Sequence, residues 1–322
     1  MRIHRTFVTA AAVLAAAAFA GAAQAASGQQ LLRQHQPVLV FHPQEEFRPT
    51  TVESFVRDSD LEAATSPTEW ALVDAAPTVG TLPAASPPIW RLNQRDCFAG
   101  APLGDLACYT AAAADEPDPV VYGRVARDGG RTVLQYWLFY YDNVYRYPFL
   151  PLGAIWQSHE GDWEVVNVVL GRGRKPVAVG ISRHCSGETR PWPDTPRMGR
   201  HPVVHVALGS HANYFEPGVH EFDRACLPPE VIGFFAQAGL PLPADVAASG
   251  PSEGIGRTGA PYAVRRISDG SPSWVAFPGF WGELEYFNAP PPIGTLPFGT
   301  GPRGPAFHEV WDEPLATLAD WS

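Results

Sequence analysis

The sequence is short of several residue types, and each shortage argues against a class of function. Lysine occurs once, at Lys175, and acidic residues outnumber basic ones, so the 322-residue chain has a formal net charge of −10. This balance argues against nucleic acid as the main partner and against simple attraction to anionic lipid. After the N-terminal segment, no apolar run is long enough to span a bilayer, so we expect no transmembrane segment.

Common catalytic and metal-binding motifs are also missing. The chain has no Gly-x-Ser-x-Gly elbow, no His-Glu-x-x-His zinc motif and no glycine loop for phosphate. No two cysteines stand in Cys-x-x-Cys spacing, which disfavours a cysteine metal site. Ser210 and His211 are adjacent, but neighbouring side chains of an extended chain point apart, which disfavours a serine hydrolase.

The N-terminus has the features of a secretory signal peptide. Arg2 and Arg5 form a basic start, residues 10–20 are apolar, and Ala23-Gln24-Ala25 is a small-residue cleavage site. Residues 1–25 are therefore predicted to be removed, and the protein is predicted to be secreted or periplasmic. The remainder, 26–322, is long enough for a single domain with a sizeable core.

Four cysteines in an exported chain suggest two disulfides. Cys97 and Cys108 lie close together in a loop-like stretch, and Cys185 and Cys226 bracket the Ser210-His211 pair. Local pairing, Cys97–Cys108 and Cys185–Cys226, is the favoured arrangement among the possible connectivities.

The pattern of strands and turns predicts an all-β fold. Residues 132–141 are aromatic on both alternating faces, which is typical of a central strand buried on each side. Strands separated by turns, with few helices, indicate a two-layer antiparallel β-sandwich with a few short helices and long loops. Residues 228–260 are rich in Pro, Gly and Ser and are predicted to be a surface insertion.

The stretch from Ser158 to Glu164 gathers an imidazole and three carboxylates before a β-branched run that reads as a buried strand. Because side chains alternate along a strand, Asp162 and Glu164 share one face, while Trp163 shares the other with Val165. Two neighbouring carboxylates at a buried strand need a cation, an arginine or a proton to offset their repulsion. Gly161 allows a bend that brings His159 back toward them.

A metal site is the first interpretation of this cluster. If the strand that ends at Asp142 pairs with the Asp162 strand as an antiparallel neighbour, Asp142 approaches the two carboxylates. Oxygen ligands with one nitrogen suit Mg²⁺ or Ca²⁺, and a second imidazole from His211 tilts the choice toward Mn²⁺ or Zn²⁺.

Two other interpretations stay open. Arginines such as Arg131, Arg146 or Arg183 could neutralise the cluster as a structural ion-pair network. Asp162 and Glu164, with Cβ atoms about 7 Å apart on one strand face, could also be a carboxylate pair for glycoside hydrolysis.

Three blocks of sequence resemble the vacuolar protein sorting-associated protein 62 family, whose biochemical activity is undefined. They are Gln135-Tyr136-Trp137-Leu138-Phe139-Tyr140, His159-Glu160-Gly161-Asp162-Trp163-Glu164 and Gly209-Ser210-His211-Ala212-Asn213-Tyr214. The second block is also similar to the heptapeptide Gly-His-Arg-His-Asp-Trp-Glu of the necrosis-inducing cytolysins, which are secreted β-sandwiches that hold a divalent cation and engage glycosylated sphingolipid head groups. The resemblance implies a cation held by Asp142, His159, Asp162 and Glu164. Ser158, Glu160 and Gly161 depart from the heptapeptide.

Three hypotheses follow. The first is an exported divalent-cation-binding β-sandwich that presents the cation to a polar ligand, such as a glycan or a lipid head group. The second is a metal-dependent hydrolase at the same site, with His211 or Glu160 as the base and Ser210 as a further site residue. The third is a purely structural cluster, with the function in surface loops such as 228–260.

Overall fold

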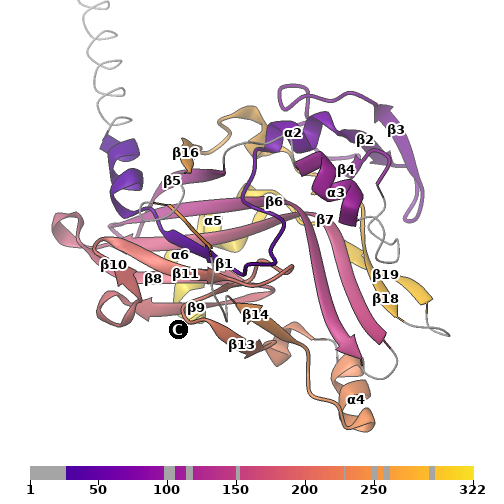
Figure 1. The fold of residues 1–322 in the computed structure, drawn as a ribbon. Helices are drawn as coiled ribbons and strands as arrows, with labels where there is room; N and C mark the ends of the chain where they lie inside the picture. The colour runs from indigo at the N-terminus through magenta and orange to yellow at the C-terminus, as the bar shows by residue number, and fades with distance from the viewer. Residues whose placement is uncertain are drawn as a thin grey trace, which may run out of the picture.

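The computed structural model describes residues 27–97, 106–113, 119–149, 153–227, 229–247, 253–256, 262–289 and 294–322. The predicted signal peptide, residues 1–25, lies outside the described residues. The described chain is mostly strand, arranged in several sheets with short helices between them (Figure 1). The predicted all-β sandwich with few short helices is confirmed. No helix in these described ranges is long and apolar enough to cross a membrane.

The largest sheet has eight strands. Its main path runs through β16 (Ala263–Arg266), β5 (Val120–Asp128), β6 (Arg131–Phe149), β7 (Gly153–Leu170), β18 (Leu284–Ala289) and β19 (Gly294–Thr300), and it also holds β8 (Pro176–Arg183) and β9 (Ser186–Pro191). The hairpin of β6 and β7 forms the long spine of the molecule (Figure 1).

Three smaller sheets complete the fold. The five-stranded sheet contains β10 (Arg197–Met198), β11 (His201–Val206), β1 (Val38–Phe41), β15 (Glu253–Ile255) and β12 (Asn213–Tyr214). The four-stranded sheet contains β17 (Phe280–Trp281), β4 (Trp90–Gln94), β2 (Ser59–Ala64) and β3 (Trp70–Asp74). The remaining pair is β13 (Gly218–Glu221) with β14 (Ala244–Ala247).

The helices are short and lie at the surface of these sheets. They are residues 27–35, α2 (Val52–Arg57), α3 (Leu106–Ala113), α4 (Pro229–Ala238), α5 (Glu309–Asp312) and α6 (Pro314–Asp320). Single 3₁₀ turns are η1 (Arg172–Arg174), η2 (Trp192–Asp194), η3 (Arg224–Cys226), η4 (Ser273–Ala276) and η5 (Pro305–Phe307).

The strand β6 is buried on both faces, as its aromatic alternation predicts. On one face, the Tyr136 hydroxyl donates to the Leu32 carbonyl at 2.8 Å, toward the N-terminal helix. On the other face, Gln135 donates to the Val310 carbonyl at 2.7 Å, and the Trp137 ring packs on Trp311 of α5. The large sheet therefore has the β1–β11 layer on one side and α5 and α6 on the other (Figure 1).

One edge of β7 positions the candidate site. β6 pairs with β7 along its whole length, whereas β18 pairs only with residues 156–158 and β8 only with residues 166–170 of the opposite edge. In the described part of the chain, residues 159–165 thus have no strand partner on that edge. The stretch that carries Asp162 and Glu164 therefore lies in a gap between two strands, where side chains and ligands can reach it.

Both disulfides follow the predicted local pairing, Cys97–Cys108 and Cys185–Cys226. The segment 228–260, predicted as a surface insertion, contributes two strands to the sheets. Its strand β14 pairs with β13 and its strand β15 pairs with β1, and Asp245 within it is fully buried. The described part of this segment is therefore built into the sheets, because its strands supply edge partners that the other segments lack.

Candidate functional site

A local bend of β7 at Gly161 decides which side chains meet. Gly161 has φ +61°, a left-handed conformation that side-chain-bearing residues rarely adopt. The residues on either side of it are sent to different faces of the sheet. Asp162 faces the β11–β12 side, where it contacts His211, while Glu160 faces the β4 side, where it contacts Gln94. The predicted bend at Gly161 is therefore present.

The Asp162 side of β7 opens into a cavity of about 420 Å³. Its polar lining includes three of the four predicted ligands, His159, Asp162 and Glu164. Other polar residues of the lining are Asn143, His184 and Ser210. Its apolar residues include Phe222, Leu227 and Phe235. The predicted sharing of one face by Asp162 and Glu164 is confirmed.

His211 supplies the positive charge of this site. Its ring is fully buried, with Nδ1 3.0 Å from Oδ2 of Asp162 and Nε2 3.4 Å from Oε1 of Glu45. The ring stacks on Tyr140 with centroids 3.8 Å apart. Burial alone lowers the pKa of His211, but the two carboxylates outweigh it and raise the pKa to about 10. His211 is thus the cationic partner of Asp162 and Glu45, and none of the arginines that the ion-pair interpretation named pairs with them among the described residues.

Glu164 is held from two sides. Its Oε2 accepts from the Ser182 hydroxyl and, at 3.2 Å, from Nδ2 of Asn213. Burial, followed by the neighbouring charge of Asp162, raises the pKa of Glu164 well above its usual range. Oε1 of Glu164 and Oδ1 of Asp162 accept no hydrogen bond from the described residues. Each carboxylate therefore keeps one oxygen for a ligand.

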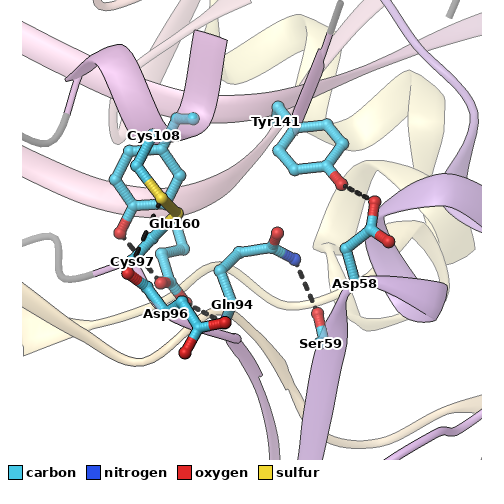
Figure 2. Close-up of a disulfide and its surroundings, with 9 residues drawn as sticks. Asp58, Ser59, Gln94, Asp96, Cys97, Cys108, Tyr141 and Glu160 are labelled. Carbon is cyan, nitrogen blue, oxygen red and sulfur yellow. Dashed lines mark hydrogen bonds between the residues drawn. A yellow bond between two sulfur atoms is a disulfide. The ribbon is translucent and has the colours of Figure 1, made fainter. Parts of the chain in front are cut away.

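Glu160 and Asp142 lie together on the other face. Glu160 accepts from the backbone N–H of Gln94 at 3.0 Å, from that of Glu283 at 3.1 Å and from the Tyr109 hydroxyl at 2.9 Å. Figure 2 shows it beside the Cys97–Cys108 disulfide, next to Gln94. Burial, followed by the charge of Glu283, raises the pKa of Glu160 to about 8.

Asp142 stands opposite Glu160 in the strand register, where Tyr140 is the residue opposite Asp162. It is fully buried, and neither of its carboxylate oxygens has a hydrogen-bond partner in the described residues. Burial, followed by the charge of Glu160, raises the pKa of Asp142 well above its usual range. Asp142 therefore lies beside Glu160 and not in the cavity that His159, Asp162 and Glu164 line.

The four predicted ligands are not assembled as a metal centre. Within the described ranges, no three His, Cys, Asp or Glu side chains are placed so that they could hold a metal ion. The chemistry of the donors still suits one, because two carboxylate oxygens and an imidazole line one cavity. The cation site and its ligand set therefore stay predictions.

Asp245 holds two residues of the cavity lining, His184 and Ser210, and no sequence motif marks it. One of its oxygens accepts from the Ser210 hydroxyl at 2.5 Å. The other lies 2.7 Å from Nε2 of His184 and 2.6 Å from the Tyr214 hydroxyl. Burial alone raises the pKa of Asp245, but His184 and the two hydroxyls lower it overall; the same pairing raises the pKa of His184. Ser210 is thus a donor to a carboxylate, and not a nucleophile paired with an imidazole.

The Asp245–His184 pair predicts a pH-dependent stability. The depressed pKa of Asp245 gives a contribution that is lost as the pH falls below about 4, and the raised pKa of His184 gives one that is lost as the pH rises above about 6.5. We expect Asp245→Asn to cost about 2 kcal/mol at about pH 5.5 and less at about pH 9. Urea unfolding at both pH values measures this, and an equal loss at both would show that His184 is not a charged partner.

Comparison with known proteins finds no family model that matches the chain. The chain is 28% identical over 218 residues to putative vacuolar protein sorting-associated protein TDA6 of Saccharomyces cerevisiae, a match that covers 58% of this chain and 44% of the relative. It is 24% identical over 226 residues to vacuolar protein sorting-associated protein 62 of the same yeast, covering 61% and 45%. The chain resembles these proteins, as its sequence predicts. It matches less than half of the length of either relative.

Among solved structures, the chain is similar to a toxin fold for microbial attack and plant defense, with 15% identity and a TM-score of 0.34 over 58% of this chain and 67% of the other. It is also similar to NLPPya in complex with mannosamine, with 16% identity and a TM-score of 0.33 over 59% and 68%.

Proposed function

We propose that the protein is an exported β-sandwich that binds a polar ligand, a glycan or a lipid head group, through a divalent cation in the cavity beside β7. The cation is held by His159, Asp162 and Glu164, with Ca²⁺ or Mg²⁺ favoured by the oxygen donors. Mn²⁺ and Zn²⁺ are the alternatives that the imidazole allows. The observation that carries the proposal is that these three side chains line one cavity, in the gap between β18 and β8.

The orientation of His159 supports a role as a ligand. Its Nδ1 lies 2.7 Å from the Gly161 carbonyl oxygen, so in the neutral ring Nδ1 donates and Nε2 keeps its lone pair. A hydrogen bond from the second ring nitrogen to a backbone carbonyl is the usual way in which proteins orient a metal-binding histidine. The acceptor is the carbonyl of Gly161, so the residue that bends the strand also orients the His159 ring.

The rest of the wall suits a polar ligand with an apolar face. Asn143 and Ser210 bring amide and hydroxyl groups, and Phe222 and Phe235 bring aromatic rings. Small-molecule sites combine a mainly apolar lining with a few polar groups that fix orientation. A sugar ring has both kinds of surface, and a volume of about 420 Å³ is large enough to hold one.

The hydrolase hypothesis is less well supported, because both of its proposed bases are engaged. His211 is an imidazolium between two carboxylates, and Glu160 accepts three hydrogen bonds on the opposite face of the sheet. A base for water activation needs a free lone pair within reach of the metal-bound water.

Export rests on the sequence of residues 1–25, and two disulfides suit an oxidising compartment. N-terminal sequencing of protein recovered outside the cytoplasm tests it, and a start near Ala26 is the expected result.

Metal analysis tests the cation. After incubation with Ca²⁺ or Mg²⁺, the wild type should retain about one equivalent per chain, and Asp162→Asn combined with Glu164→Gln should retain none. Glu285→Gln is the matched control, because Glu285 lines the same cavity but is bonded to Gln157 and lies outside the ligand set. Mass-spectrometric metal analysis and titration calorimetry give the stoichiometry. Equal retention by the wild type and the double variant would place the cation elsewhere, and no retention by any protein would reject the cation.

The ligand is tested on glycan and lipid arrays with and without a chelator. Binding that the chelator and the double variant both remove supports the whole proposal. Binding that persists in the presence of the chelator and in the double variant would show that the ligand binds without the cation.

A further inference from the structure

A second cavity lies at the other end of β7. It has a volume of about 550 Å³ and is lined from three directions. The β7–β8 turn contributes Arg174 and Lys175, the β10–β11 turn contributes Arg200, and the N-terminal helix contributes Gln34 and His35. The turn begins after Leu170, six residues beyond Glu164, so the two cavities are about 20 Å apart along the strand.

The lining of this second cavity is cationic without any acidic counterpart. Arg174, Lys175 and Arg200 all line it, and no Asp or Glu is among the lining residues. None of the three cations forms an ion pair with another described residue. Three unpaired cations around one hollow give it a positive potential, in a chain whose net charge is −10.

His35 gives independent support for a ligand site in this hollow. Only 1% of its surface is exposed, and neither ring nitrogen makes a hydrogen bond of good geometry with a described residue, although the Arg200 backbone approaches the ring. Buried polar groups in native proteins are nearly always paired, so an orphaned imidazole that lines a cavity calls for a partner within it. Burial lowers the pKa of His35, which leaves a neutral ring that still carries one N–H donor.

We propose that this cavity binds a phosphate or sulfate group carried by a small molecule. Arg174, Lys175 and Arg200 supply charge, and Arg can grip a tetrahedral anion with two parallel hydrogen bonds. His35 and the Gln34 amide supply donors from the opposite wall. The volume exceeds that of the bare anion, so the remaining space accommodates the group to which it is esterified. This site is separate from the cation site and does not depend on it.

Calorimetry with inorganic phosphate and with glucose 6-phosphate tests the proposal, against chloride at the same ionic strength. Lys175→Gln and Arg200→Gln should each weaken binding of both probes about tenfold, because each removes one charge-assisted contact. Arg172→Gln is the matched control, since it removes the same charge from the same turn but does not line the cavity. It should change the affinity less than twofold.

The single lysine gives a second readout. Because Lys175 is the only lysine of the chain, acylation by an amine-reactive reagent reports on this side chain and on the N-terminus alone. Phosphate should protect Lys175 from acylation, whereas chloride should not.

His35→Leu separates binding from folding. Since neither ring nitrogen makes a hydrogen bond of good geometry, the apolar replacement should leave the thermal midpoint without phosphate unchanged or raised, while phosphate affinity falls. The proposal is overturned if neither probe binds beyond chloride, or if the Lys175, Arg200 and His35 variants bind as the Arg172→Gln control does.

Discussion

Gly161→Ala is expected to lower the free energy of unfolding by more than about 3 kcal/mol, which is the scale of a buried backbone clash. An added Cβ would stand 2.2 Å from the Trp281 carbonyl oxygen, and the backbone at φ +61° is already unfavourable for alanine. The carbonyl belongs to β17 and cannot rotate away as a side chain would. The bend that turns Glu160 and Asp162 to opposite faces therefore depends on the missing side chain of this residue.

Urea unfolding at neutral pH measures the loss, and Gly130→Ala is the matched control. Gly130 has φ +73° but no atom within 4 Å of an added Cβ, so its variant has the backbone cost alone, about 1 kcal/mol. The difference between the two variants isolates the contact with Trp281. Similar losses of unfolding free energy in the two variants would show that the backbone near Trp281 moves to accommodate the added Cβ at no cost.

His211→Asn should lower the free energy of unfolding by about 3–5 kcal/mol, because it leaves Glu45 and Asp162 buried without their shared cation. Asparagine is the fitting replacement, since His211 has φ +56° and Asn tolerates the left-handed region. The raised pKa of His211, about 10, also fixes the sign of the pH dependence. Its contribution is complete below about pH 6.5 and is lost as the pH rises through about 10.

Restoring charge balance provides the control for this effect. Glu45→Gln and Asp162→Asn, added to His211→Asn, make all three positions neutral and should recover most of the lost stability, because uncharged partners can still form hydrogen bonds. Unfolding by urea across this pH range gives both results. If the triple variant is as unstable as His211→Asn alone, the loss comes from packing against Tyr140 and not from charge.

Local patterns were sufficient to predict the strands and part of the site. The alternation along β6 and the shared face of Asp162 and Glu164 need only the two-residue period of a strand. The Cys97–Cys108 disulfide was predicted from short spacing within a loop-like stretch, and Cys185–Cys226 is the pairing that this choice leaves. The bend at Gly161 could also be predicted, because glycine adopts left-handed backbone conformations that other residues rarely reach.

What escaped prediction comes from contacts between distant segments. Glu45 meets His211 because the two residues follow the neighbouring parallel strands β1 and β11, and nothing in its neighbourhood in the sequence marks it as a partner of an imidazolium. Asp245 lies in a segment whose composition indicates a loop, yet it is fully buried among three donors. The position of Asp142 could be predicted only coarsely, because antiparallel pairing places it near the start of the Asp162 strand without fixing the register. The register places it opposite Glu160, which the bend at Gly161 turns to the other face from Asp162. Its role as a ligand stays a prediction.

The position of β1 constrains how the chain reaches this fold. Its two partners are β11 and β15, and the pairing with β11 is parallel, so the first strand of the described chain sits between two that are synthesised much later. Such pairings give a high contact order, because a long loop must close before the strands gain any hydrogen bonds. The strand edge of Val38–Phe41 stays exposed meanwhile and can pair with other chains. Slow folding, and a need for protection of this edge until the last third of the chain has emerged, are therefore built into the topology.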